Sequence, residues 1–201
     1  MSVHQRSGTT TTYLTADEFW ELPEIKGRRL ELVEGCVVEM APAGPRHNEI
    51  AFYLAVLIFQ YVRQRRLGWA SGDGTGYLIR GERESVLIPD ASFVAAERIP
   101  PGETPDTGWP FPPDLAVEVV SPSDRADDVN AKVTTYLQAG TRLVWVVWPR
   151  TRTIYAFRAG GADTLGPDDR LDGGDVLPGF SVPVAEIFEA GETPDEGEER
   201  N

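Results

Sequence analysis

The segment from Ile50 to Val62 places the strongest constraint on how this chain can fold. Its residues, IAFYLAVLIFQYV, are apolar nearly all round, and only Gln60 is clearly polar. Together with Pro42 and Pro45 before it, this segment predicts a helix from about residue 45 to residue 66. A bilayer span needs about 20 apolar residues, so the run is too short to cross a membrane. Protein must therefore cover the helix.

A helix that lies on one face of a sheet needs only one apolar stripe, so this helix carries more apolar surface than a single sheet can cover. Either other elements of the same chain bury the excess, or a second subunit does. Two-fold pairing is the commonest closed assembly. We expect a homodimer, with a helix sandwiched inside the monomer as the competing arrangement.

The length of 201 residues suits one domain with a full core. We expect a flexible N-terminus over 1–11, a single domain over 12–190 and a disordered acidic tail over 191–201. The N-terminus lacks the apolar core of a signal peptide, which predicts a soluble, cytoplasmic protein. Cys36 is the only cysteine, so we expect a buried free thiol and no disulfide.

Turn and cap signals divide the chain into short elements. The series Thr15-Ala-Asp-Glu18 is a capping box, with Leu14 and Phe19 placed as a hydrophobic staple. A second helix is expected over 124–139, after Ser121-Pro122-Ser123-Asp124 and before Gly140. Strands are expected over 28–34 and 36–41, joined by a tight turn at Glu34-Gly35. Further strands are expected over 76–80, 86–88, 91–95, around Glu118, over 142–148 and over 152–158, followed by a strand and a short helix in DVLPGFSVPVAEIF. Residues 97–113 contain six prolines and predict a surface loop.

Three residues in these elements carry the chemistry. Asp90 stands in the strand-like LIPDASFV, Glu118 in the strand-like DLAVEVV, and Lys132 on the helix that follows. Two carboxylates can share a hard divalent cation through their oxygens, and an amine beside them can orient water or neutralise charge on a phosphate. This set is what metal-assisted hydrolysis of a phosphodiester needs.

Glu118 and Lys132 are each unusual in their surroundings. An ionised carboxylate in an apolar strand is costly unless it is paired or bound to a metal, which favours a functional role for Glu118 over a structural ion pair. The chain has 19 basic residues, of which only Lys26 and Lys132 are lysines. Helical spacing places Lys132 on the flank of an apolar stripe formed by Val129, Val133, Tyr136 and Leu137.

Five blocks of sequence, in this order, resemble the Uma2 family within the PD-(D/E)xK nuclease superfamily. They are LELVEGCVVEM, PAGPRHNEI, IPDASFV, PPDLAVEVVSPSDRADDVNAKVTTYLQAG and RLVWVVWPRTRTIYAF. The resemblance implies an α/β restriction-endonuclease-like fold with a mixed central sheet flanked by helices, a Mg²⁺-dependent nuclease site and dimerisation. The superfamily's lysine two residues after the second acid is replaced here by Val120. In Uma2-like proteins that lysine is displaced onto the following helix, which corresponds to Lys132.

The expected catalytic residues are therefore Asp90, Glu118 and Lys132. Asp90, Glu118 and the carbonyl of Val119 are expected to hold Mg²⁺, for which Mn²⁺ can substitute. His47 lies at the start of the long helix, where a histidine is most often exposed. It also matches a histidine of the family blocks, which makes it an auxiliary candidate for the site. Glu31 is a second auxiliary candidate, because its carboxylate could reach a metal.

The charge of the chain bears on its partner. The net charge is −13, but residues 160–201 hold twelve acids and two arginines, so most of the excess lies at the C-terminal end. The only basic cluster that stands out is Arg63, Arg65 and Arg66 at the end of the long helix. The site and the resemblance predict nucleic acid, namely DNA, as the partner.

Two other classes of protein remain open at this point. A nuclease-like fold can serve as a binding or assembly module without turnover. A pair of carboxylates can also serve a glycosidase, which needs one protonated and one ionised carboxyl group and neither metal nor lysine. Lys132 and the family blocks argue against the glycosidase.

Overall fold

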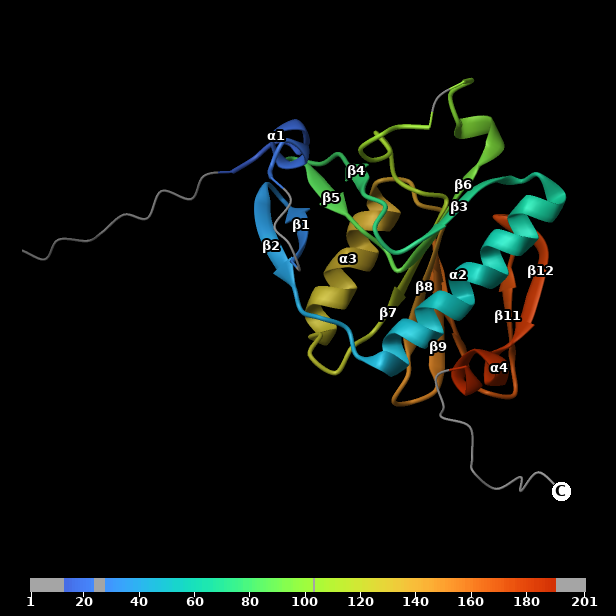
Figure 1. The fold of residues 1–201 in the computed structure, drawn as a ribbon. Coiled ribbons are helices and arrows are strands. Elements are labelled where there is room, and N and C mark those ends of the chain that lie inside the picture. Colours follow the sequence, from blue (N-terminus) through green and yellow to red (C-terminus); the bar gives the residue numbers. More distant parts are fainter. Residues whose placement is uncertain (1–12, 24–27, 103, 191–201) are drawn as a thin grey trace, which may run out of the picture.

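The fold is built around a mixed sheet of six strands in the computed structural model, which describes residues 13–23, 28–102 and 104–190 (Figure 1). The strand order is β10-β9-β8-β7-β6-β3, and only β7 and β8 run parallel to each other. The strands are β3 (Gly68–Gly72), β6 (Ala91–Ala95), β7 (Leu115–Val119), β8 (Leu143–Trp148), β9 (Thr153–Arg158) and β10 (Gly161–Leu165). This arrangement confirms the predicted mixed central sheet.

Two smaller sheets complete the molecule. One has four strands in the order β2-β1-β5-β4, and the other pairs β11 with β12. Their bounds are β1 (Arg29–Val33), β2 (Cys36–Met40), β4 (Tyr77–Ile79), β5 (Ser85–Leu87), β11 (Arg170–Gly173) and β12 (Leu177–Pro183). The predicted tight turn between β1 and β2 is confirmed, since Glu34 and Gly35 both have positive φ, at 47° and 77°.

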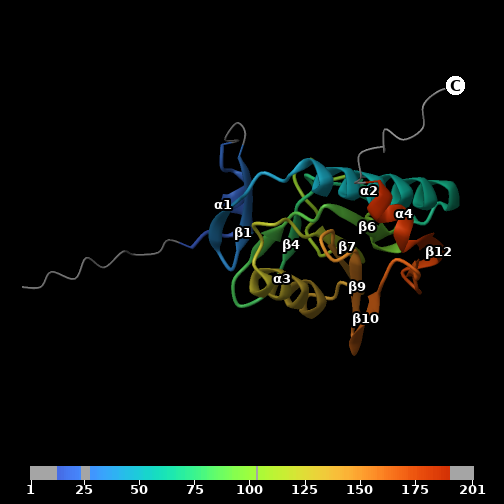
Figure 2. The same cartoon turned by 90° about the horizontal axis from the view of Figure 1, so that it is seen from below.

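Helices cover both faces of the central sheet, as Figure 2 shows with α2 on one side and α3 on the other. The helices are α1 (Ala16–Trp20), α2 (Pro45–Arg65), α3 (Ala126–Gln138) and α4 (Val184–Glu189), with a 3₁₀ turn η1 (Ala96–Arg98). The side chains on the two faces of β7 belong to two different hydrophobic cores. Leu115, Val117 and Val119 pack with α2, whereas Ala116 and Val120 pack with α3. Glu118 therefore belongs to the α3 side.

Several local predictions are confirmed by the geometry. Thr15 and Glu18 form the capping box of α1 through both reciprocal hydrogen bonds. Gly140 has a φ of 102° directly after the end of α3, a conformation in which glycine avoids the strain of a side chain. The stripe on α3 is also present, since Val129, Val133 and Tyr136 are buried.

Other local predictions were wrong or incomplete. The helix predicted from residue 124 begins at Ala126, because the Asp124 carboxylate accepts a hydrogen bond from the Ser121 amide and closes a turn before the helix. Strands β3, β10 and β11 were not predicted. The Cys36 thiol is free but only half-buried, because β2 is the edge strand of its sheet. The predicted flexible N-terminus and the acidic tail lie outside the described residues.

The long helix α2 is only partly covered by its own chain. Its buried side includes Ile50, Leu54 and Ile58, which pack on the central sheet. On its outer side Phe52 is 72% exposed and Phe59 is 46% exposed. Among the described residues, no helix is long and apolar enough to cross a membrane. The excess apolar surface foreseen from the sequence is thus present on the monomer, and the homodimer remains a prediction.

Candidate active site

Glu31, His47, Asp90, Glu118 and Lys132 lie on five different elements near the place where the two larger sheets meet. Glu31 comes from β1, His47 from the first turn of α2, Asp90 from the residue before β6, Glu118 from β7 and Lys132 from α3. The antiparallel register of β6 with β7 pairs Ala91 with Val117, so Asp90 is level with Glu118. The side chains form two groups of contacts, Glu31–Lys132–Glu118 and His47–Asp90, and the second group is tied to β7 through its main chain.

Asp90 is fixed by main-chain hydrogen bonds. Its side chain is buried, and Oδ2 accepts a hydrogen bond of 2.7 Å from the amide of Val119. Its own amide donates to the carbonyl of Val117 at 2.9 Å. Both bonds tie Asp90 to β7, so the carboxylate is held next to the strand that carries Glu118.

Glu118 is held by two side chains of α3. The hydroxyl of Tyr136 donates to its Oε1 at 3.0 Å, and the ammonium of Lys132 lies 3.5 Å from its Oε2. Lys132 and Tyr136 are four residues apart, so they project from the same side of the helix. The carboxylate of Glu118 is therefore fixed at both oxygens.

Lys132 joins this group to the four-stranded sheet through Glu31. Its ammonium donates to Oε1 of Glu31 at 3.0 Å and lies 2.9 Å from Oε2, where the geometry is that of an ion pair rather than a hydrogen bond. The same Oε1 accepts a bond of 2.9 Å from the amide of Ile88. The Glu31 side chain is 2% exposed and that of Lys132 is 18% exposed, so this pair is screened from water.

His47 contacts Asp90 from α2, which covers the face of the central sheet opposite to α3. Its Nε2 lies 3.3 Å from Oδ2 of Asp90, and its Nδ1 lies 3.4 Å from the side-chain oxygen of Asn48. The ordinary reading of His47 as an exposed residue was wrong, because the imidazole is buried. Burial lowers the pKa of His47, but the hydrogen bond and the charge of Asp90 outweigh it, so the pKa lies above its ordinary value.

The electrostatics of Glu118 and Lys132 follow from their burial together. Burial raises the pKa of Glu118 to about 7, and the charges of Asp90 and Glu31 act in the same direction, while Lys132 opposes them. Burial alone would lower the pKa of Lys132, but the charges of Glu118 and Glu31 hold that pKa above its ordinary value. Burial and the charge of Glu118 also raise the pKa of Tyr136. Lys132 is therefore a cation, and Tyr136 is a neutral donor.

The donor set is compatible with a divalent cation. The carboxylates of Glu31 and Glu118 both contact the ammonium of Lys132, and the carboxylate of Asp90, which contacts His47, is a third acid of this largely buried group. Within the described part of the chain no three His, Cys, Asp or Glu side chains are arranged to hold a metal ion. A smaller protein donor set suits Mg²⁺, which usually keeps several waters and is bound through one or two carboxylates. Asp90 and Glu118 provide that number.

Tyr136 contacts Glu118 of the candidate site, and the sequence did not predict this contact. Its place in the apolar stripe of α3 indicated a core residue, and the ring is indeed fully buried. The signal that could have revealed it is its position four residues after Lys132, because a buried tyrosine hydroxyl needs a hydrogen-bond partner.

Comparisons with known proteins agree with this architecture. Residues 16–185 match the model of a family, Uma2, that is described as "Putative restriction endonuclease". A crystal structure of "a putative nuclease belonging to DUF820" from Anabaena variabilis ATCC 29413 superposes with a TM-score of 0.75, covering 89% of this chain and 99% of that one. The sequence identity is 23%, so this similarity concerns the fold.

A relative is also found among cyanobacterial proteins. An uncharacterised protein of Synechocystis sp. (strain ATCC 27184 / PCC 6803 / Kazusa) is 29% identical over 128 residues, which are 63% of this chain and 70% of the relative. Because that protein is uncharacterised, the similarity adds no activity.

The raised pKa of Glu118 predicts a dependence of stability on pH. In EDTA, the folded state favours the protonated carboxyl group, so stability should fall as the pH rises from about 4.5, the ordinary pKa, to about 7. Relative to Glu118→Gln, the wild-type free energy of unfolding should decrease by up to about 3 kcal/mol across this window. Urea unfolding at several pH values measures the difference. The exposed Glu39→Gln is the control, and a difference that stays constant from pH 4.5 to 7 would contradict the assignment.

Proposed function

The chain belongs to the Uma2 family, and from this premise we propose that it is a metal-dependent endonuclease that hydrolyses phosphodiester bonds of DNA. The observation that carries the proposal is the pair of acids Asp90 and Glu118, which the register of β6 with β7 places level with each other, with the Lys132 ammonium 3.5 Å from Glu118. An acid pair with an adjacent amine suits inline attack of water on a phosphodiester.

Asp90 and Glu118, with the carbonyl of Val119, are the groups that would hold Mg²⁺, or Mn²⁺ in its place. When bound there, the ion would polarise the phosphate and lower the pKa of a water molecule. Val119 is suited to this position because its amide already holds Asp90 in place.

The remaining residues position these groups. Lys132 would orient the attacking water or stabilise the charge that develops on the phosphate. Glu31 holds the Lys132 ammonium, and Tyr136 holds the second oxygen of Glu118. His47 contacts Asp90 on the same oxygen that binds the Val119 amide, which restricts how that carboxylate can turn.

Cleavage of DNA by this protein should depend on a divalent metal ion. Purified protein should nick plasmid DNA in Mg²⁺ or Mn²⁺ but not in EDTA, and Asp90→Asn and Glu118→Gln should each abolish nicking. Single-stranded DNA and RNA, incubated in parallel, define the substrate. Calorimetry with Mn²⁺ should show binding to the wild type and loss of binding in both variants.

The exposed acid Glu39 provides a matched control, since Glu39→Gln removes a carboxylate of β2 away from the site. Unchanged Mn²⁺ affinity in Asp90→Asn and Glu118→Gln would show that the proposed metal site is wrong. Absence of any metal-dependent hydrolysis by the wild type would instead favour a nuclease-fold binding or assembly module.

Substitution of Lys132 tests its proposed role in hydrolysis. Lys132→Ala should keep Mn²⁺ affinity but lose hydrolysis by about 100-fold or more, as expected when a positioned charge is removed from the transition state. Lys132→Arg should hydrolyse DNA little faster than Lys132→Ala, because the guanidinium is planar and larger than an ammonium and presents its hydrogen-bond donors in a different geometry. Circular dichroism checks that both variants fold. Full hydrolysis by folded Lys132→Ala would remove Lys132 from the mechanism.

The exposed side of α2 supports the proposal of a homodimer, centred on Phe52, whose side chain is the most exposed large apolar group of the described residues. Sedimentation at micromolar concentration should give twice the 22.1 kDa mass of the chain. Phe52→Asp should give the monomer, since a charge would be buried at the interface. A wild-type monomer at this concentration contradicts the dimer.

A further inference from the structure

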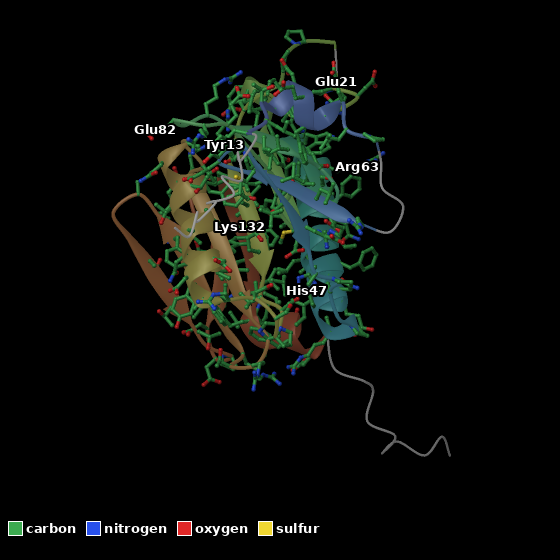
Figure 3. All side chains as sticks on the ribbon, turned by 90° about the vertical axis from the view of Figure 1, so that its left-hand side faces the viewer. Tyr13, Glu21, His47, Arg63, Glu82 and Lys132 are labelled. Carbon is green, nitrogen blue, oxygen red and sulfur yellow. The ribbon has the colours of Figure 1, made fainter. Side chains whose placement is uncertain are left out.

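The basic cluster at the end of α2 has no part in the candidate active site. Arg63 and Arg65 belong to the last turn of the helix, and Arg66 follows as its left-handed cap, with φ of 56°. Figure 3 shows His47 and Arg63 at opposite ends of α2. Sixteen helical steps separate the two residues, a distance of about 24 Å along the axis. Any ligand of this cluster therefore binds well away from Asp90 and Glu118.

The three guanidinium groups differ from several other arginines of the molecule in their partners. Arg98 pairs with Asp114, and Arg142 pairs with Asp175. By contrast, no carboxylate among the residues that the structure describes pairs with Arg63, Arg65 or Arg66. Their charges are thus not neutralised by ion pairs, although the helix C-terminus favours them.

Aromatic rings lie beside these charges. The Arg63 guanidinium lies 5.8 Å from the centre of the Phe59 ring, and that of Arg65 lies 3.9 Å from the centre of the Tyr61 ring. The Phe59 side chain is 46% exposed. Arginine over an exposed ring is an arrangement that can also accept a flat ligand on the ring.

An open depression of about 580 Å³ adjoins the cluster. Its lining includes Phe59, Arg63, Arg66, Trp69, Ile99 and Pro100. Trp69 is half-buried and packs edge-on against Trp109, with ring centres 5.4 Å apart, so the indole is fixed. The depression therefore combines one exposed ring, that of Phe59, with two charged guanidinium groups.

We propose that this depression binds a nucleotide unit of a single-stranded nucleic acid, with the base against Phe59 and the phosphate on Arg63 and Arg66. Bases stack on aromatic side chains without regard to sequence, and guanidinium groups attract the backbone. The net charge of −13 disfavours a polyanion overall, so binding of one needs a local group of adjacent positive charges such as Arg63, Arg65 and Arg66. The choice of nucleic acid rests on the proposed function.

The test measures binding without cleavage. Fluorescence anisotropy of a labelled oligothymidylate of 12 nucleotides is recorded in EDTA with the full chain. The double variant Arg63→Gln/Arg66→Gln should weaken binding at least tenfold and reduce the slope of log affinity against log salt by about 1.4, as expected for two lost contacts to a single strand. Phe59→Ala should weaken binding severalfold with little change in that slope. The same sequence as a duplex should bind more weakly, because its bases are already stacked.

Arg83→Gln is the matched control, since Arg83 is also exposed and lies over an aromatic ring, that of Tyr13, outside the depression. This variant should bind like the wild type. Unchanged binding by the double variant, or equal affinity for single strand and duplex, would overturn the proposal. A dimer that dissociates in Phe59→Ala without any loss of oligonucleotide binding would overturn it in favour of a second copy of the chain.

The plasmid assay keeps this proposal separate from the proposed function. If the wild type cleaves DNA while the arginine variants bind as it does, the depression is not a nucleotide site and the endonuclease assignment stands. If the wild type binds through Arg63 and Arg66 but cleaves nothing, the nucleotide site stands and the endonuclease assignment fails.

Discussion

The ion pair between Lys132 and Glu31 connects the three parts of the molecule on which the candidate site depends. Lys132 belongs to α3, Glu31 to β1 of the four-stranded sheet, and Glu118, the second partner of the lysine, to β7 of the central sheet. Because all three side chains are largely buried, loss of the lysine would leave two carboxylates without a counter-charge, which is far more costly than loss of an exposed pair. Lys132 therefore links the four-stranded sheet, through Glu31, to Glu118 of the central sheet.

Each carboxylate of the site accepts a hydrogen bond from a different neutral donor. The amide of Val119 serves Asp90, the hydroxyl of Tyr136 serves Glu118, and the amide of Ile88 serves Glu31. These neutral donors partly compensate the removal of the carboxylates from water, but they do not cancel the negative charge. Burial and the neighbouring acids therefore still raise the pKa of Glu118.

The sequence predicts those features that depend on local spacing. The stripe on α3, the turn at Glu34 and Gly35, and the stop at Gly140 each follow from a few adjacent residues, and each is present in the structure. Strand β3 could not be foreseen, because GWASG has no alternation of apolar and polar residues and pairs only with β6. The contacts of Glu31 could not be foreseen either, since its two partners, Ile88 and Lys132, are 57 and 101 residues away. Long-range pairing of this kind is decided by packing and leaves no local pattern in the chain.

The long helix α2 relates the candidate site to the rest of the surface. Its first turn contributes His47 to the site, its buried side anchors it on the central sheet through Leu54 and Ile58, and its last turn ends in unpaired arginines. A helix packed along its length moves as one body, so the distance between its two ends is fixed by the number of turns rather than by the substrate. On a protein whose acidic residues outnumber its basic ones, by 32 to 19, attraction for a polyanion must come from local groups. The arginines and His47, which contacts Asp90, are thus held at a constant separation by α2.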